Sequence, residues 1–295
     1  MAKEPRPLAN NMPAQFDQAL AAHRPELHRY LARMTGSVID GEDLVQDTLL
    51  AATRALAKGE DVTHMRGWLF RIAHNTALNA IRARKSEAAM KETLSHQPDT
   101  NVTLPLEGGT RDALLPYLGL TAKQRSAVIL RDVFGHTTAE VADLTGLSQD
   151  ATKSALKRGR AALATADIEA PVEVSDQDKA RLATYAAHFN AHAFDALRDM
   201  LAREVHLDLV SVEKRNGQKA VGGYFGNYAR QSDWLMAPGL VEGRPAILAF
   251  NRDTPGDAPQ YFIHLNFDGD HIAQIRDFRY ARYAMDDAHW VRLGS

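Results

Sequence analysis

The sequence predicts a multidomain protein in which two all-α segments, the second with a helix-turn-helix, precede an α+β domain. Apolar residues recur three and four positions apart through the first half of the chain, as in amphipathic helices. A turn at Gly146 separates two short helical segments. After Pro171 the apolar pattern changes to a period of two, which is typical of strands. A length of 295 residues suits two or three such domains.

The composition is that of a globular protein, with 45% hydrophobic and 24% charged residues. The absence of cysteine excludes disulfides and thiolate metal sites. A net charge of −2 hides an acidic cluster within residues 40–47 and basic clusters within 66–85 and 153–160. No apolar run is long enough to span a bilayer, and the first ten residues lack the apolar segment of a signal peptide. We therefore expect a cytoplasmic protein with no membrane contact and a disordered tail at residues 1–11.

The first helical domain is predicted over residues 12–85. Val45, Leu49, Ala52 and Leu56 follow a four-three-four spacing, which gives a helix one buried stripe. Gly59 interrupts this helix, and another is expected to begin near residue 65. Residues 86–110 lose the periodicity and collect proline and glycine, which predicts a linker.

The second helical domain is predicted over residues 111–166. Thr121 is expected to cap one helix, and Ser148 is expected to cap the second helix of the helix-turn-helix. The charged face of that last helix fits the major groove, with its first residues at base edges and its basic residues at phosphates. The alternative is an ordinary helical hairpin with a solvated charged face.

A second linker is predicted at 167–176 and an α+β domain at 177–295. Ser175 and Asp178 form a candidate capping box ahead of a helix. Val205, Leu207 and Leu209 alternate with polar residues, as in a strand. The Asp268-Gly269 pair between two such strands predicts a hairpin.

Three motifs in the helical half resemble those of extracytoplasmic-function (ECF) RNA polymerase sigma factors. Residues 40–48 resemble the acidic helix that holds the polymerase β′ clamp, and residues 68–79 with the basic residues after them resemble the promoter-opening helix of sigma domain two. Residues 120–125, 128–133, 140–142 and 147–148 resemble sigma domain four. The linker stands where housekeeping sigma factors have domain three, which is typical of the ECF type.

This resemblance implies two partners, namely promoter DNA and core RNA polymerase through its β′ clamp and β subunits. The residues implied in core binding are Asp40, Asp43, Gln46 and Asp47. Those implied at the −10 element are His64, Trp68, Arg71, Asn75, Asn79 and Arg82. Those implied at the −35 element are Ser148, Gln149, Asp150, Lys153, Ser154, Lys157 and Arg158.

The chemistry of these residue types agrees with those roles. Asp40, Asp43 and Asp47 share a helical face that suits cations on a partner. Arginine contacts phosphates, and asparagine amides read base edges. The family places the pocket for an unstacked base in residues 59–64, and opening a duplex needs such a pocket. Trp68 has a second interpretation, as a core residue near a helix start.

The tail resembles the SnoaL-like branch of the ketosteroid-isomerase cone fold, on its element order and on residues 243–247 and 274–279. This implies a regulatory domain with a small-molecule ligand as a candidate partner.

Acid–base candidates in the tail are His188, His192, His206, His264, Asp208, Asp277 and Tyr185. His188 and His192 have metal-ligand spacing but no third ligand. We expect no catalytic residue, no metal and no cofactor. A pocket wall or docking surface is expected from Tyr185, Phe189, Trp234, Phe262 and Phe278.

Two other functions remain open from the sequence. One is a helix-turn-helix regulator that acts without polymerase. The other is a cone enzyme or ligand sensor with a DNA-binding appendage. The acidic helix beside a basic, asparagine-rich one favours the sigma factor over the first of these.

Overall fold

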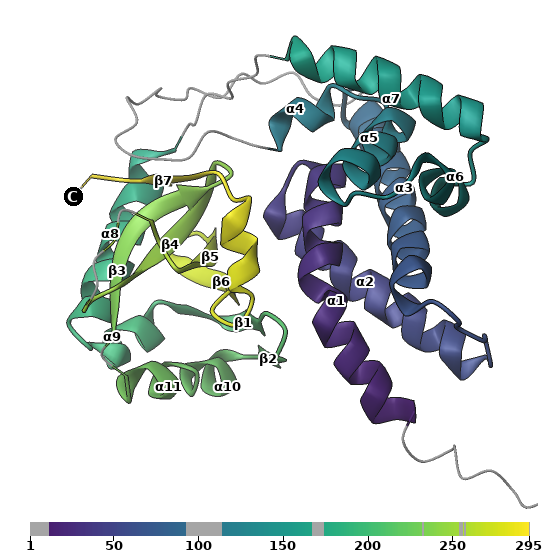
Figure 1. The fold of residues 1–295 in the computed structure, drawn as a ribbon. Helices are drawn as coiled ribbons and strands as arrows, with labels where there is room; N and C mark the ends of the chain where they lie inside the picture. Colours follow the sequence, from purple (N-terminus) through teal and green to yellow (C-terminus); the bar gives the residue numbers. More distant parts are fainter. Residues whose placement is uncertain are drawn as a thin grey trace, which may run out of the picture. The chain divides into compact units, whose positions relative to one another are not determined.

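The protein is described by a computed structural model that covers residues 12–92, 114–166 and 174–294, apart from positions 232, 254, 255 and 257. The chain forms two compact units, here called unit 1 (the described residues up to 166) and unit 2 (those from 174) (Figure 1). The predicted tail at 1–11, most of the linker at 86–110 and much of the linker at 167–176 lie outside the described residues.

Unit 1 is wholly helical in its described residues. Its elements are α1 (Met12–Thr35), α2 (Val38–Ala57), α3 (Met65–Glu92), α4 (Leu115–Leu118), α5 (Ala122–Val128), a π-helical turn (Ile129–Val133), α6 (Thr138–Thr145) and α7 (Gln149–Ala164). Helices α1, α2 and α3 pack on one another. The predicted break at Gly59 is confirmed, because α2 ends at residue 57 and Gly59 has a φ of +86°.

Helix α3 is longer than predicted. It continues to Glu92, into the segment expected to be a linker. Residues 86–92 contain alanine, glutamate, lysine and methionine, which favour helix even where no apolar stripe guides packing. Hydrophobic periodicity indicates which face of a helix is buried and does not report intrinsic helix propensity, so it did not predict this extension.

The helix-turn-helix is confirmed in α6 and α7. The turn contains Gly146 at a φ of +68°, a left-handed conformation that suits glycine. Ser148 caps α7, and its hydroxyl accepts the Ala151 N–H at 3.2 Å. Thr121 likewise caps α5 in a capping box with Gln124. Each cap satisfies N–H groups that the helix leaves without a partner.

The two predicted helical domains share one hydrophobic core. Leu31 and Phe70 from the first domain and Val128, Ile129 and Leu144 from the second belong to the same buried cluster. The 12–85 and 111–166 segments therefore form one compact unit in this conformation.

Unit 2 is the predicted α+β domain. Its elements are α8 (Asp176–Asn190), α9 (Phe194–Asp199), β1 (Leu201–Leu209), β2 (Glu213–Asn216), α10 (Gln218–Gly222), α11 (Phe225–Ala229), β3 (Trp234–Val241), β4 (Arg244–Asn251), β5 (Tyr261–Asp268), β6 (His271–Asp277), a 3-10 turn (Arg282–Asp286) and β7 (Trp290–Arg292). The strands form one sheet in the order β2-β1-β6-β5-β4-β3-β7. The β1–β6 pair is parallel and the other pairs are antiparallel.

The helices of unit 2 cover one face of this sheet. Helix α8 packs on β3 and β4, and Ser175 caps it by accepting the Asp178 N–H at 3.0 Å. The hairpin between β5 and β6 is confirmed, with Asp268 paired to His271 across the turn. A long helix, a short helix and a sheet follow one another in the order that the cone resemblance implies (Figure 1).

No helix in the described parts of either unit has the length and apolar character needed to cross a membrane.

Candidate functional site

One exposed stripe runs along α2. Asp43 and Asp47 are exposed and Gln46 is half-buried between them, at the spacing that places residues on one helical face. Leu50 continues the stripe one turn further and is 54% exposed, which is high for a large apolar side chain. The stripe therefore combines two carboxylates with an apolar residue, a combination that suits a protein partner with cations around an apolar contact.

Asp40 does not belong to this exposed stripe. Its carboxylate lies 2.9 Å from the Arg84 guanidinium of α3, and its backbone N–H bonds the Ser37 hydroxyl at the start of α2. Gly41 lies against α1, because a Cβ there would meet the backbone N of Ala32 at 2.7 Å. The structure thus separates Asp40 from the other three residues predicted to bind polymerase.

A second exposed stripe runs along α3. Arg71, Asn75, Asn79 and Arg82 are all exposed, at intervals of three and four residues. The Arg82 guanidinium donates to the Asn79 side-chain oxygen at 3.2 Å. The stripe presents cations and amides together, so it can contact phosphates and base edges at once.

Trp68 lies apart from this stripe. It is 9% exposed, belongs to the core of unit 1, and its indole N–H donates to Glu60 at 2.8 Å. The hydrogen bond ties the start of α3 to the segment after α2. His64 is exposed just before α3, where its carbonyl accepts the Trp68 backbone N–H. The geometry favours the core interpretation of Trp68 over a base contact.

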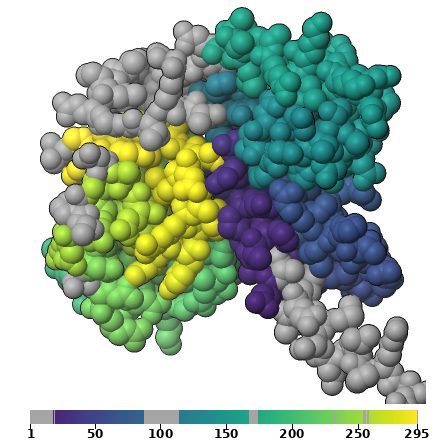
Figure 2. All heavy atoms as spheres, in the orientation of Figure 1, coloured from purple at the N-terminus to yellow at the C-terminus, as the bar shows by residue number. Residues whose placement is uncertain are grey.

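A third exposed stripe lies on α7, which forms part of the surface of unit 1 (teal in Figure 2). Gln149, Asp150, Lys153, Lys157 and Arg158 are exposed. The Arg158 guanidinium donates to the half-buried Ser154 hydroxyl at 3.0 Å, and Lys153 pairs with Asp150 at 3.5 Å. The Ser148 hydroxyl is used by its cap.

The position of α7 depends on a close approach to α5. A Cβ on Gly159 would meet Val128 Cγ2 at 2.7 Å, nearer than packed carbons tolerate. We expect Gly159→Leu to lower the free energy of unfolding by about 2 kcal/mol through overpacking. Chemical unfolding followed by circular dichroism measures this, with Ala161→Leu on the exposed side of α7 as the control. Equal stability of the two variants would contradict the close packing of α5 and α7.

A buried polar cluster joins α1, α3 and α5. Nδ1 of His74 lies 2.9 Å from the Tyr30 hydroxyl and 3.2 Å from the Ser126 hydroxyl. All three side chains are nearly or fully buried. Burial, with the nearby charge of Arg82, lowers the pKa of His74 to about 4. The imidazole is therefore neutral at pH 7 and its Nδ1 can accept from either hydroxyl.

Arg125 of α5 extends this cluster toward the carboxyl end of α1. Its guanidinium donates to the Met34 carbonyl and to the carbonyls of Leu118 and Leu120 at 3.1 Å each. Three carbonyls at or near helix ends thus gain donors. Burial lowers the pKa of Arg125 from its ordinary value.

Two arginines of α3 make further polar contacts, one with α1 and His136 and the other with α6. Arg66 donates to Glu26 at 2.8 Å and lies 3.2 Å from Nε2 of His136. Arg71 Nη2 lies 3.1 Å from the Asp143 carboxylate of α6. Arg71 belongs to the exposed stripe of α3, so one predicted DNA contact is occupied by a carboxylate in this conformation.

Unit 2 has a buried cluster of its own around Asp277. The hydroxyls of Tyr224 and Tyr228 donate to Oδ2 at 2.8 and 2.7 Å, and the Arg279 backbone N–H donates to Oδ1 at 2.9 Å. Burial raises the pKa of Asp277 above its ordinary value, against the effect of these three donors. The pKa values of Tyr224 and Tyr228 are raised by burial and by the nearby carboxyl.

Several buried donors inside unit 2 have no hydrogen-bond partner among the described residues. They include the Tyr185 hydroxyl and the indole N–H of Trp234, both fully buried atoms. The pKa of Tyr185 is raised first by burial and then by the charge of Asp277. Unpartnered buried donors are costly, so an acceptor oxygen beside either group would stabilise it.

Three of the other predicted acid–base residues of the tail lie away from this cluster. His192 and His206 are exposed, and Asp208 lies 3.5 Å from Arg276 on the opposite side of its strand from Leu207 and Leu209. No group of three potential metal-ligating side chains occurs in the described residues.

The five aromatic residues predicted to line one pocket or surface are divided between the two faces of the sheet. Tyr185, Phe189 and Trp234 belong to the interior core. Phe262 and Phe278 stack on each other with ring centroids 4.2 Å apart, and strand alternation places them on the other face, since Asp277 and Ile263 point inward. The expected single wall is therefore wrong.

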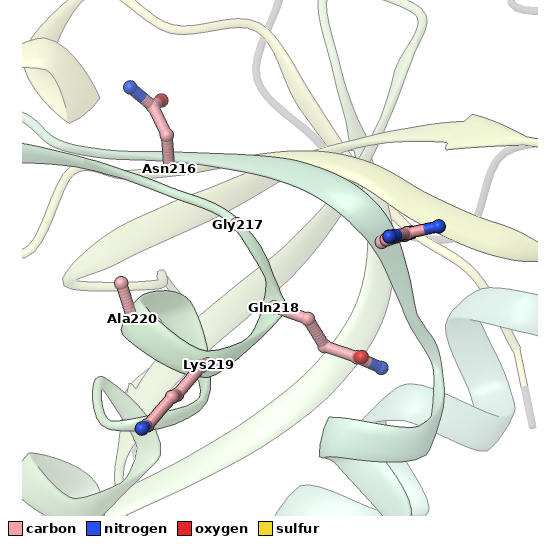
Figure 3. A pocket seen from close by; sticks show the side chains of 6 residues that line it. Asn216, Gly217, Gln218, Lys219 and Ala220 are labelled. Carbon is pink, nitrogen blue, oxygen red and sulfur yellow. The ribbon is translucent and has the colours of Figure 1, made fainter.

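An open surface pocket lies at the corner of β1, β2 and α10. Figure 3 shows it lined by Asn216, Gly217, Gln218, Lys219 and Ala220, with Arg203 beside them. The Gln218 amide donates to the carbonyls of Arg198 and Leu201, so it holds the corner together. The pocket has basic groups but is a surface depression separate from the Asp277 cluster.

Sequence reasoning missed several of these features. The exposed position of Leu50 could have been predicted from the sequence, because Leu50 continues the helical spacing of Asp43 and Asp47. The contacts of Asp143 and Ser126 could not have been predicted, because their partners lie on other helices more than 50 positions away in the chain.

Comparisons with known proteins complete the description of the site. Residues 19–87 match the family Sigma-70 region 2, and residues 118–163 match the family Sigma-70, region 4. The ECF RNA polymerase sigma factor SigG of Mycobacterium tuberculosis is 32% identical over 227 residues, covering 66% of this chain and 61% of that protein. The chain thus spans about three fifths of the length of SigG.

Two further relatives come from the same organism. The ECF RNA polymerase sigma factor SigM is 32% identical over 151 residues, covering 50% of this chain and 75% of SigM. The crystal structure of the ECF sigma factor SigJ shares 19% identity with a TM-score of 0.35, covering 90% of this chain and 95% of that one.

Proposed function

The chain belongs to the family of ECF RNA polymerase sigma factors, and on this premise we propose that it binds core polymerase and starts transcription at promoters with −10 and −35 elements. The observation that carries the proposal is the set of three exposed stripes on α2, α3 and α7. The first is acidic with one apolar residue, and the other two combine cations with amide or hydroxyl groups. A DNA-binding regulator that never joins polymerase would not need the acidic stripe on α2.

The proposed contacts follow the three stripes. Asp43, Gln46 and Asp47 bind the β′ clamp, and Leu50 adds an apolar contact. The amides and guanidiniums of α3 bind the −10 element. The basic residues of α7 bind phosphates near the −35 element, while Gln149 and Ser154 lie where base edges can be read. The protein acts in the cytoplasm, where polymerase and promoters are.

Unit 2 has a proposed regulatory role and no catalytic one. Its Asp277 carboxyl is buried and held by three donors of the protein itself, an arrangement that supports a structural role for this group. The unpartnered donors of Tyr185 and Trp234 support a small ligand with an acceptor oxygen. Such a ligand changes sigma activity by binding two states of the chain with different affinity.

Transcription in vitro tests the main proposal. The full-length chain is added to core polymerase on fragmented genomic DNA of its host, and the RNA products are sequenced. Defined start sites that share a −10 and a −35 motif support the proposal, and products identical to those of core alone refute it. A chain ending at Ile168 tests the role of unit 2, because equal activity of the two chains would leave unit 2 without a regulatory function.

The α7 stripe makes a quantitative prediction. We expect Lys153→Ala and Lys157→Ala each to weaken promoter affinity on every sequence, and to flatten its dependence on salt by about one unit for each phosphate that is no longer neutralised. Gln149→Ala is the matched control, because a base contact affects one position of the site and leaves the salt slope unchanged. Binding titrations at several salt concentrations measure both. If the lysine and glutamine variants behave alike, α7 has been placed wrongly on the DNA.

A further inference from the structure

Arg160 lies on α7 beyond the residues that the sequence resemblance implies at the −35 element. Lys153, Lys157 and Arg160 are separated by four and three residues, so they lie along one side of the helix, and all three are exposed. At a rise of 1.5 Å per residue the three positions extend over about 10 Å of the helix. Arg160 therefore continues the row of cations that the two lysines begin.

A carboxylate holds the Arg160 guanidinium from one side. Asp132, in the π-helical turn after α5, accepts a hydrogen bond from Nε of Arg160 at 2.9 Å and one from Nη2 through its other oxygen. Two parallel hydrogen bonds of this kind fix the plane of a guanidinium. Asp132 thus gives Arg160 one orientation, which a long side chain on an exposed helix face does not otherwise keep.

The other side of the same guanidinium is open. Its Nη1 has no hydrogen-bond acceptor among the residues that the structure describes, and 52% of the Arg160 side chain is exposed. A guanidinium has five N–H donors, and Asp132 accepts two of them. Three donors therefore remain for an anion that arrives from outside. In duplex DNA that anion is a backbone phosphate, whose oxygens match the geometry of a guanidinium.

The π-helical turn that carries Asp132 is closed by its own hydrogen bonds. The His136 N–H donates to the Leu130 carbonyl at 3.0 Å, and the Arg131 guanidinium donates to the His136 carbonyl at 2.8 Å. A π turn contains more residues per turn than an α-helix, so the side chains after it leave the α-helical register, and such turns are frequent at functional sites. In the structure this turn presents Asp132 to α7.

We propose that Arg160 is a further phosphate-binding residue of α7 and that Asp132 is its positioning residue. The proposal rests on the proposed function, in which α7 binds DNA, and adds one contact to it. Lys153 and Lys157 bind phosphates as flexible point charges, whereas Arg160 presents donors in a fixed direction. Because Asp132 sets this direction before DNA arrives, less conformational entropy is lost on binding.

A variant with the net charge of the parent tests the contact. In the double variant Asp132→Asn with Arg160→Gln, one carboxylate and one guanidinium are lost together. The full chain is titrated with a duplex of random sequence at several salt concentrations. We expect the plot of log affinity against log salt to be flatter by about 0.9 units in the double variant, as for one phosphate that is no longer neutralised. Equal slopes would show that the ion pair only neutralises itself, and would overturn the contact.

Two conservative variants test the role of Asp132. Arg160→Lys keeps the charge but cannot form two parallel hydrogen bonds, and Asp132→Glu keeps the carboxylate but moves it by one methylene. We expect both to retain the salt dependence of the parent and to bind the duplex about threefold more weakly, since the cation is no longer oriented in advance. Affinity equal to that of the parent in both variants would refute the positioning role.

The stability of the same variants separates this contact from a purely structural ion pair. Unfolding followed by circular dichroism is measured for each. Lower stability of the double variant with an unchanged salt slope overturns the proposal. The random duplex reports phosphate contacts without any promoter, so a chain that shows the flatter slope but starts no transcription with polymerase would refute the sigma function alone. Transcription without the change of slope would refute the Arg160 contact alone.

Discussion

A chain with both Asp43→Lys and Asp47→Lys is expected to lose nearly all affinity for core polymerase while it keeps its fold. Removing one charge-assisted hydrogen bond from the docked complex costs about 2 kcal/mol or more of binding free energy. Removing two therefore raises the dissociation constant about a thousandfold. Both side chains are exposed on α2, away from the core of unit 1, so their replacement changes the free energy of unfolding little.

The control for this variant carries the same change of net charge elsewhere. Asp199→Lys with Asp253→Lys reverses two exposed carboxylates of unit 2. Titration of labelled protein with core polymerase compares the two double variants at matched salt. If both weaken binding equally, the effect is one of overall charge and the α2 stripe is not the docking surface. Unchanged binding in the α2 variant alone leads to the same conclusion.

The sequence predicted secondary structure well where one physical signal decided it. The caps at Thr121, Ser148 and Ser175, the turn at Gly146 and the hairpin after Asp268 each depend on a local backbone requirement that a residue type satisfies. The same approach failed to predict the extension of α3 to Glu92, because intrinsic helix propensity, and not a buried face, decides where this helix ends.

The site was predicted less completely, because exposure and pairing depend on tertiary contacts. Helical spacing placed Arg71, Asn75 and Asn79 on one side of a helix, and they do share an exposed face. Spacing could not show that Asp40 faces Arg84, or that Trp68 is buried against Glu60. Those partners lie on other elements, and a single sequence gives no measure of such distances.

The tail shows the same limit in a different form. Alternation predicts which strand residues share a face, but not which face is the interior. Phe262 and Phe278 therefore entered the same expected surface as Trp234, although they lie across the sheet from it. Asp277 was one of seven acid–base candidates, and its two tyrosine donors came from α11 and the residue before it, which no spacing rule connects to β6.

The Asp277 cluster supports a second large effect, on the stability of unit 2. Asp277→Ala leaves the Tyr224 and Tyr228 hydroxyls and the Arg279 N–H buried without an acceptor, and we expect it to lower the free energy of unfolding by about 3 kcal/mol or more. Tryptophan fluorescence measures this in a Trp68→Phe background, where the two remaining tryptophans, Trp234 and Trp290, both lie in unit 2.

Dependence on pH distinguishes a structural carboxyl from a simple space-filling residue. Because burial raises the pKa of Asp277 in the folded protein, the folded state holds this proton more tightly than the unfolded state does. The contribution of Asp277 to stability is therefore greatest below its ordinary pKa and falls as pH rises toward the raised value. Asp277→Asn keeps the shape but does not titrate, so the stability of the parent relative to Asp277→Asn should decline with rising pH. A difference that stays constant from about pH 4 to pH 8 would show that Asp277 titrates alike in the folded and unfolded states. The raised pKa of Asp277 in the folded protein would then be wrong.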